Sequence, residues 1–153
     1  VWTKQTLGEK VYVEIAVSPT DPENTVFIKD AVMQAVMTEL GSRLGTKSES
    51  SSQMYVRLQS VGFTPMQRDS QGYVVAYRTT VSLGFQVHDG NGDVHAFSTV
   101  GRYDFVIEPS SVISETKRFE SIKEGSAKAI DQAVLQLAAT QMKRSHRQSF
   151  QGE

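Results

Sequence analysis

The feature that most constrains the fold is an apolar alternation that keeps one parity through two neighbouring segments. Residues 73–87 read YVVAYRTTVSLGFQV and place their large apolar side chains on odd numbers, and residues 94–107 do the same. A period of two is typical of a β-strand that buries one face. The segments therefore predict two long strands whose odd-numbered side chains share one face of a sheet.

The turn between these strands follows from that parity. Paired residue numbers in an antiparallel hairpin have a constant sum, so odd residues face odd residues only when that sum is even. A three-residue loop, Gly90–Gly92, meets this condition. It gives the cross-strand pairs Phe85–Phe97, Tyr77–Phe105, Thr79–Tyr103 and Val75–Ile107. Since aromatic and β-branched pairs stabilise sheets, we predict this register.

The segment HDGNGDVHAF, which includes this turn, contains side chains of the types that bind metals. The predicted register places His88 on the polar face and His95 on the apolar face, so the two rings cannot share an ion. A calcium loop would require glycine at Val94 and a bidentate glutamate at Val100. We interpret the segment as a hairpin tip without a metal, and His95 as a satisfied residue at the edge of the core.

Two more strands are indicated upstream. Residues 11–17, VYVEIAV, are short and β-branched. Residues 54–63, MYVRLQSVGF, alternate up to Leu58 and then change parity, which indicates a β-bulge near residues 59–62. The opposite, even-numbered face of the 73–87 strand is polar and carries Arg78, Thr80, Ser82, Gln86 and His88.

Two segments have helical periodicity. In the first, residues 26–45, we expect a cap at Asp21 or Asn24 and an end at Gly41 or Gly45. A broad buried face is predicted from Ile28, Val32, Met33, Ala35, Val36, Met37, Leu40 and Leu44.

The second helical segment buries the stripe Phe119, Ile122, Ile130, Ala133, Val134 and Leu137. It begins near residue 115, or near 121, where Ser121 and Glu124 fit a capping box. It ends near Lys143 and Arg144, before a loose tail over 145–153. The order strand, helix, three strands, helix predicts an α+β fold, a two-layer α/β sandwich with two helices on one face of a four-stranded, mostly antiparallel sheet.

Composition fits one domain of 153 residues, with an ordered core over about 10–142. The net charge of −1 gives no general attraction to nucleic acid. No apolar run approaches the roughly 18 residues that would span a bilayer. The absence of cysteine excludes disulfides and thiol chemistry. Because the chain begins at Val1, we expect that an N-terminal part has been removed.

Signatures of enzymes do not appear. LGSRLG lies at a helix end rather than after a strand, no Gly-x-Ser-x-Gly elbow is present, and the carboxylates are scattered. His146, beside Arg144 and Arg147, belongs to the predicted tail. The residues therefore indicate a binding or scaffold domain that is not an enzyme and needs no cofactor.

Three stretches carry a resemblance to a known family. VYVEIAVSPTDPENTVFIKDAV is similar to its first strand, proline-rich exit and first helix, MQRDSQGYVVAYRTTVSLGFQV to its second hairpin, and SETKRFESIKEGSAKAIDQAV to its last loop and helix. The family is LptE, the outer-membrane lipopolysaccharide-assembly lipoproteins, particularly the divergent ε-proteobacterial form. The resemblance covers about residues 10–142.

The resemblance implies two helices on a four-stranded sheet and a non-enzymatic role. Family members are anchored at the periplasmic face of the outer membrane by a lipidated N-terminal cysteine. They occupy the lumen of the LptD β-barrel, which delivers lipopolysaccharide to the outer leaflet. The missing cysteine departs from this pattern, as in a chain truncated after it.

The resemblance also implies basic residues that bind lipopolysaccharide. Arg68, in the loop MQRDSQGY, matches one such position, and Lys117 and Arg118 lie near a second position ahead of the last helix. Guanidinium and ammonium groups form charge-assisted contacts with phosphate. The alternatives are that all three are ordinary solvated charges, and that the chain is a periplasmic adaptor with a protein ligand on its polar face or on the edge strand 11–17.

Overall fold

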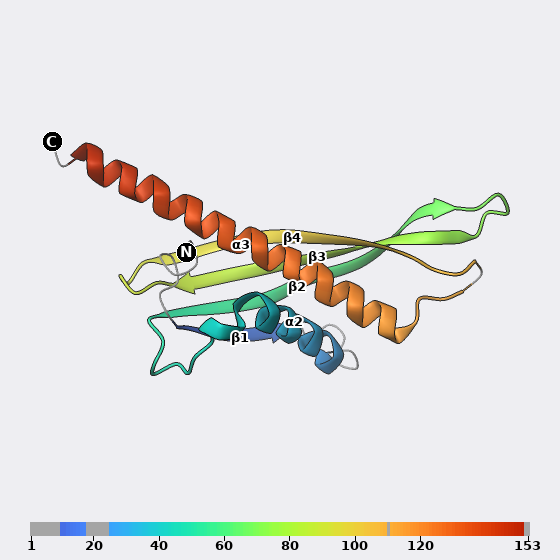
Figure 1. Cartoon of the computed structure of the whole chain (residues 1–153), viewed down its shortest axis with the longest axis horizontal. Coiled ribbons are helices and arrows are strands. Elements are labelled where there is room, and N and C mark those ends of the chain that lie inside the picture. Colours follow the sequence, from blue (N-terminus) through green and yellow to red (C-terminus); the bar gives the residue numbers. More distant parts are fainter. Residues whose placement is uncertain (1–9, 18–24, 110, 152–153) are drawn as a thin grey trace.

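The computed structural model describes residues 10–17, 25–109 and 111–151 and confirms the predicted α+β fold (Figure 1). Its strands are β1 (Val11–Val17), β2 (Ser52–Arg68), β3 (Val74–His88) and β4 (Val94–Val106). Its helices are α2 (Thr25–Leu40), the short 3₁₀ turn η1 (Gly41–Arg43) and α3 (Glu115–Gln151). Both long helices lie on one side of the sheet, as a two-layer sandwich requires.

The sheet has the strand order β1-β2-β3-β4. β1 is parallel to β2, whereas β2, β3 and β4 form an antiparallel meander. β1 and β4 are therefore the two edges. The prediction that the first strand lies at the border of the sheet is confirmed.

The register of β3 and β4 is the predicted one. Phe85 pairs with Phe97 and Tyr77 with Phe105. The rings of the first pair stack with centroids 5.5 Å apart, and those of the second lie 6.0 Å apart. The Phe85–Phe97 pair therefore lies on one side of the sheet, the side that the helices cover.

The predicted bulge is present in β2 at Gln59, because the register with β3 shifts between Leu58 and Ser60. Before the bulge, the alternate residues Ser52, Met54, Val56 and Leu58 are buried. The inserted residue moves the alternation onto odd numbers, so that Val61 and Phe63 then face the helices and are partly buried.

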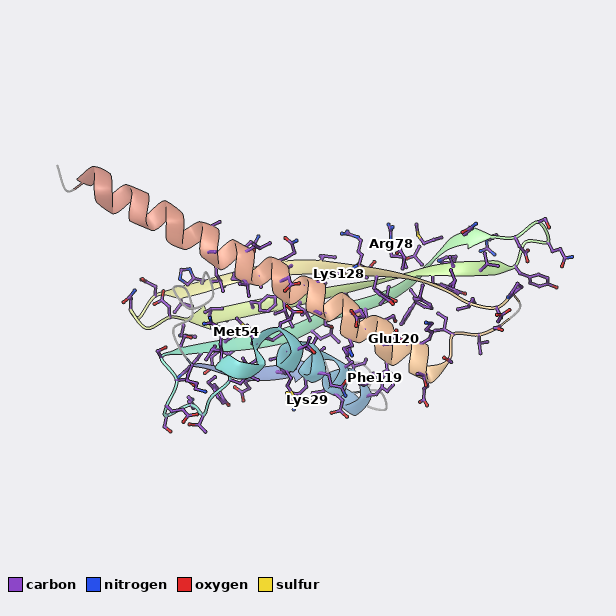
Figure 2. The ribbon with its side chains drawn as sticks, viewed as in Figure 1. Lys29, Met54, Arg78, Phe119, Glu120 and Lys128 are labelled. Atoms are coloured by element: carbon purple, nitrogen blue, oxygen red, sulfur yellow. The ribbon has the colours of Figure 1, made fainter. Side chains whose placement is uncertain are left out.

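The helices bury one stripe each against the sheet and against each other. The ring of Phe27 in α2 packs edge to face on the ring of Phe119 in α3, with the ring centroids 5.3 Å apart. Phe119 is labelled in Figure 2. The buried residues of α2 are Ala31, Val32, Ala35, Val36 and Leu40, and those of α3 include Ile122, Ala129, Ile130, Ala133 and Leu137.

The buried face of α2 is narrower than predicted, and the predicted burial of Met33 and Met37 was wrong. Met33 and Met37 are 39% and 58% exposed. They lie on the side of α2 that turns away from the core, because the core is built on the neighbouring stripe of Val32, Ala35 and Val36. A helix at the border of a layer buries only the stripe in contact with its neighbours.

α3 crosses β4 at a contact between two glycines. A Cβ atom on Gly101 would overlap the carbonyl oxygen of Gly125, so only glycine permits this approach. The hydroxyl of Thr99 donates a hydrogen bond of 2.6 Å to the carbonyl oxygen of Ala129, one turn further along α3. The helix is therefore fixed to the backbone of the edge strand.

The helix termini separate the predicted alternatives. α3 begins at Glu115, and the Ser114 hydroxyl accepts a hydrogen bond of 3.1 Å from the backbone N–H of Lys117. Ser121 lies buried within the helix, so the later start was wrong. α2 ends at Leu40, directly before Gly41, whereas the predicted caps Asp21 and Asn24 lie outside the described residues.

The predicted end of the last helix near Lys143 was also wrong. α3 continues to Gln151, since no glycine or proline interrupts the sequence between Gly125 and Gly152. His146 therefore lies within the helical range rather than after it.

Candidate functional site: the open face of the sheet

The sheet face opposite the helices is mainly polar, although β4 adds the exposed Val94, Val100 and Val106, and it is not covered by any described element. The side chains of β1 and β2 that share it include Tyr12, Glu14, Tyr55 and Arg57, and β3 and β4 add Thr80, Ser82, Gln86, His88, Ser98 and Arg102. The meander makes this surface long and narrow (Figure 1). We refer to it as the open face.

The open face is hollowed where small residues meet. Ala16, Gly84 and Ala96 come from three strands and lie beside the larger side chains of Tyr55 and Arg57. The resulting hollow has a volume of about 520 Å³. Its exposed lining is mostly apolar and also carries hydroxyl, amide, guanidinium and carboxylate groups, so the hollow offers a partner both apolar contact and hydrogen bonds.

Gln59, the bulge residue, closes one side of this hollow. Its Oε1 accepts a hydrogen bond of 2.8 Å from the Ser82 hydroxyl, and its Nε2 donates one of 3.0 Å to the Ser98 hydroxyl. The side chain lies across Gly84, where a Cβ atom would be 2.8 Å from the Nε2 of Gln59. The bulge thus links β2 to β4 over the intervening strand.

Arg68 lies at the last position of β2, in the turn that leads to β3. The turn is built by Asp69, whose Oδ1 accepts hydrogen bonds from the N–H groups of Gln71 (2.9 Å) and Tyr73 (3.0 Å). Gly72 has a φ of 86°, which glycine adopts without strain. The guanidinium of Arg68 donates one hydrogen bond of 3.1 Å to the carbonyl oxygen of Gly72 and forms no ion pair within the described part of the chain.

Lys117 and Arg118 lie in the first turn of α3. The ammonium of Lys117 is 3.8 Å from Glu120, and the guanidinium of Arg118 lies 5.5 Å from the centroid of the Phe63 ring. Phe63 and Arg68 are five residues apart in β2, which is roughly 16 Å along a strand. The structure therefore does not gather the three predicted basic residues into one cluster.

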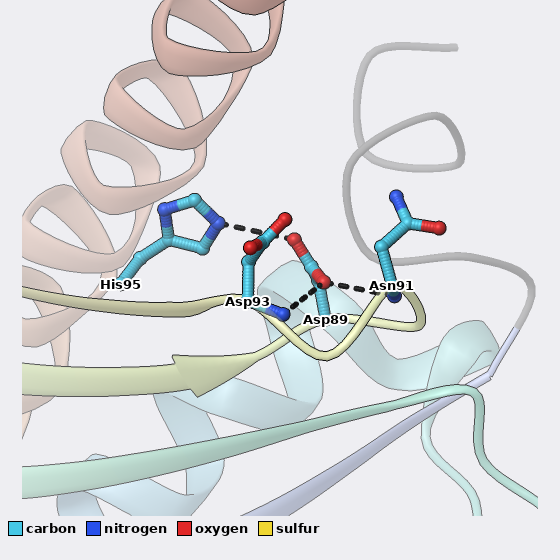
Figure 3. Close-up of polar contacts among 4 residues, drawn as sticks. All are labelled: Asp89, Asn91, Asp93 and His95. Carbon is cyan, nitrogen blue, oxygen red and sulfur yellow. Dashed lines mark hydrogen bonds and ion pairs between the residues drawn. The ribbon is translucent and has the colours of Figure 1, made fainter.

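The turn between β3 and β4 repeats the turn at Asp69. The Oδ1 of Asp89 accepts hydrogen bonds from the N–H groups of Asn91 (2.9 Å) and Asp93 (3.1 Å), and Gly92 has a φ of 85° (Figure 3). The Nε2 of His95 lies 3.1 Å from the Oδ2 of Asp89. Burial raises the pKa of Asp89, but the bonds from His95, Asn91 and Asp93 outweigh it and lower the pKa overall.

This geometry confirms the hairpin tip. His95 has a hydrogen-bonding partner at the edge of the core, whereas His88 lies across the sheet, with its ring 5.6 Å from that of Tyr55. Among the residues that the structure describes, no three histidine or acidic side chains are arranged to hold a metal ion.

With this geometry established, comparison with known proteins identifies the family. The family model for lipopolysaccharide assembly, LptE, matches residues 11–143. The chain belongs to the LptE family. LptE proteins are non-enzymatic lipoproteins of lipopolysaccharide assembly, so a role as a cell-envelope lipoprotein follows from membership.

Solved structures share the fold. Rare lipoprotein B from Shewanella oneidensis is 15% identical, with 88% of this chain and 99% of that chain covered at a TM-score of 0.54. A putative lipoprotein from Caulobacter crescentus is 12% identical, with coverage of 86% and 91% and a TM-score of 0.51. No curated protein matches the chain. Neither helix in the described part has the length and apolar character needed to cross a bilayer.

Proposed function

We propose that this LptE-family chain occupies the lumen of an LptD-like outer-membrane β-barrel and binds lipopolysaccharide there. The observation that carries the proposal is the open face, a long and mainly polar surface left uncovered, whereas α2 and α3 cover the opposite face except at the β2–β3 hairpin. The lumen of a large barrel is polar and lined by inward side chains. An elongated domain with one hydrophilic face suits such a lining.

The proposal includes the location of the chain. A lipidated cysteine on the N-terminal side of Val1 would hold the domain at the periplasmic face of the outer membrane. Arg68 would contact phosphate of lipopolysaccharide from the tip of the β2–β3 hairpin, where its guanidinium is exposed. Lys117 and Arg118 are weaker candidates, because each already contacts a neighbouring side chain.

Co-purification tests the barrel interaction. Ala96→Arg places a long charged side chain in the hollow of the open face, whereas Leu135→Arg places the same side chain at a 60% exposed position of α3. We expect Ala96→Arg to abolish co-purification with the LptD-like barrel and Leu135→Arg to retain it, with both variants folded by circular dichroism. Equal capture of the barrel by both variants would contradict the use of the open face.

Lipopolysaccharide binding tests Arg68. Arg68→Asp reverses a charge on an exposed hairpin and removes one hydrogen bond, so we expect weaker binding, with stability changed by about 0.5 kcal/mol or less. Lys47→Asp, in the loop before β2, is the matched control and should bind normally. Unchanged binding by Arg68→Asp removes this residue from the site.

The edge strand β1 supports a second function. Its outer backbone groups from Tyr12 to Val17 have no strand neighbour among the described residues. A periplasmic adaptor could add a strand of its protein ligand there. Capture of a periplasmic protein that Ile15→Pro abolishes, without any barrel, would favour this function over the first.

A further inference from the structure

Three basic side chains from three elements meet at the outer edge of β4. Arg78 of β3, Arg102 of β4 and Lys128 of α3 line a hollow of about 440 Å³ together with Tyr103 and Asp104. Figure 2 shows Arg78 and Lys128 near this edge. None of these residues belongs to the positions implied by the family resemblance. We refer to this surface as the β4-edge cluster.

Arg78 is held in place by Asp104, its direct cross-strand partner. Its Nε donates to Oδ1 at 2.8 Å and its Nη2 donates to Oδ2 at 3.0 Å. This bidentate hydrogen bonding lowers the pKa of Asp104 and raises that of Arg78. Because both carboxylate oxygens are engaged by Arg78, Asp104 neutralises one of the three cations and leaves the other two without a dedicated carboxylate.

Those two cations approach the edge from different sides. Arg102 has the same parity as Asp104 and lies on the open face, and it forms no ion pair with the residues that the structure describes. Lys128 comes from the helix side, with its ammonium 5.6 Å from the centroid of the Tyr103 ring. The cluster therefore encloses the edge of β4 rather than lying on one face.

The backbone adds donors at the same edge. The N–H of Ile107 donates to the carbonyl oxygen of Val75, so the odd-numbered residues of β4 direct their N–H groups toward β3. The N–H groups of Arg102 and Asp104 consequently point away from β3. Since β4 is the last strand of the sheet, no further strand in the described chain accepts them.

We propose that the β4-edge cluster binds a phosphate monoester, with Arg102 and Lys128 as its principal ligands and Arg78 as a fixed third cation. Three cations and one carboxylate leave two net positive charges, which match a phosphate dianion. Guanidinium groups bind phosphate oxygens through paired donors and an ammonium acts as a point charge. The volume of the hollow leaves room for the sugar or headgroup that carries the phosphate.

This inference goes beyond the proposed function, because it needs neither a barrel nor Arg68. The phosphate can be free, on a soluble sugar, or on a glycolipid headgroup, and the binding chemistry is common to all three. The first experiment therefore uses a soluble probe, glucosamine 1-phosphate, with the whole chain. The Nε–Hε resonances of the arginines are followed by nuclear magnetic resonance at about 0.1 M salt, where exposed charges are already screened over about 10 Å.

The test variant is Arg102→Gln/Lys128→Gln, which keeps the Arg78–Asp104 pair. The control, Lys29→Gln/Lys47→Gln, removes the same charge from α2 and the loop before β2. The test variant loses two charge-assisted contacts, so we expect it to bind the probe at least about tenfold more weakly. The control should bind within about twofold of the original chain. Equal weakening in both variants, or undiminished binding by the test variant, would overturn the proposal.

A second arm identifies the source of the phosphate. Detergent micelles containing a diphosphorylated glucosamine glycolipid are compared with micelles of the same glycolipid after phosphatase treatment. Tighter binding to the phosphorylated micelles than to glucosamine 1-phosphate, lost in the test variant, assigns the site to a lipid headgroup. Equal affinity for micelle and soluble probe assigns it to soluble phosphate esters. Binding to dephosphorylated micelles that survives in the test variant would contradict phosphate recognition.

Discussion

The two halves of β2 have the same kind of sequence but different surroundings. From Ser52 to Leu58, alternate residues are buried beneath the helices, whereas no residue from Gln59 to Arg68 is buried. Figure 1 shows the cause, because the β2–β3 hairpin extends beyond both helices. We refer to Ser52–Leu58 as the covered half of β2 and to Ser60–Arg68 as its bare half.

The unequal burial of the two halves of β2 shows that strand periodicity alone does not determine which residues are buried. Val61 and Phe63 continue the apolar alternation into the bare half, and Tyr77 continues it in the facing part of β3, yet each remains partly exposed. Val61 and Phe63 pack only against the margin of the core, and nearer the hairpin tip Tyr77 stacks on Phe105 across the strands. Stability is therefore concentrated in the covered half, and the bare half is a ribbon that presents Arg68 at its tip.

The greatest loss of stability is expected at the glycine contact between α3 and β4. Gly101→Ala would drive a methyl group into the carbonyl oxygen of Gly125 and force α3 away from β4, at a cost of about 3 kcal/mol or more. Gly62→Ala is the matched control in the bare half, where nothing lies within 4 Å of the added atom, and should change stability by about 0.5 kcal/mol or less. Urea denaturation measures both. Equal losses would show that the bare half is packed as tightly as the crossing of α3 over β4.

A smaller, pH-dependent effect is expected where α2 meets α3. The hydrogen bond between Glu39 and Asp131, then burial, and then the charges of Asp131 and Glu124 raise the pKa of Glu39 to about 7. A raised carboxyl pKa means that the folded state binds the proton more tightly. This contribution to stability is fully present below about pH 4.5 and is lost as the pH rises through 7.

Glu39→Gln removes this titration. We expect the variant to be more stable than the original chain by roughly 1 kcal/mol at pH 8 and to differ little from it at pH 5. The gain at pH 8 is small because water screens the interaction between these partly exposed carboxylates. Melting temperatures at both pH values provide the measurement, with Glu115→Gln, at the start of α3, as the control. A variant whose advantage is the same at pH 5 and pH 8 would rule out the shared proton.

The smallest expected effect concerns the contact that ties the bare half to α3. Arg118 lies over the Phe63 ring, and a cation–π contact of this exposed kind contributes about 0.5 kcal/mol. Arg118→Gln should therefore lower the free energy of unfolding by about that amount in the original chain. In a chain that already carries Phe63→Leu, Arg118→Gln should cause no additional loss. A double-mutant cycle measures the interaction. Additive losses would show that the ring and the guanidinium act independently, which would leave Arg118 available to a ligand.

Most of the sheet could be predicted because local parity specifies it. The odd-numbered aromatic residues fixed the pairing of Phe85 with Phe97, and the parity change after Leu58 indicated the bulge at Gln59. The burial of Met33 and Met37 was predicted wrongly, since helical periodicity defines a broad apolar arc without showing which part of it meets the neighbours. The length of α3 was underestimated, because a basic pair also occurs within a helix and does not by itself end one.

The two hollows were missed because they join residues that are distant in sequence. Gln59, Gly84 and Ala96 meet only once three strands are aligned, and a glycine within a strand was the single available signal. Lys128 reaches Tyr103 only because α3 crosses β4 at Gly125. The angle of that crossing is a tertiary property, so no pattern within α3 could have placed this lysine beside Arg102.

The parallel pairing of β1 with β2 has a consequence for how the molecule assembles. The β2–β3 and β3–β4 hairpins close over short turns, and one aspartate accepts the hydrogen bonds of each turn. β1 and β2, by contrast, are separated in sequence by α2 and the following loop, so they can pair only after this long segment has closed. Loop closure over a longer stretch costs more entropy and slows folding. We expect the meander to form first and β1 to join last, and the amide hydrogens of β1 to exchange with solvent before those of β3.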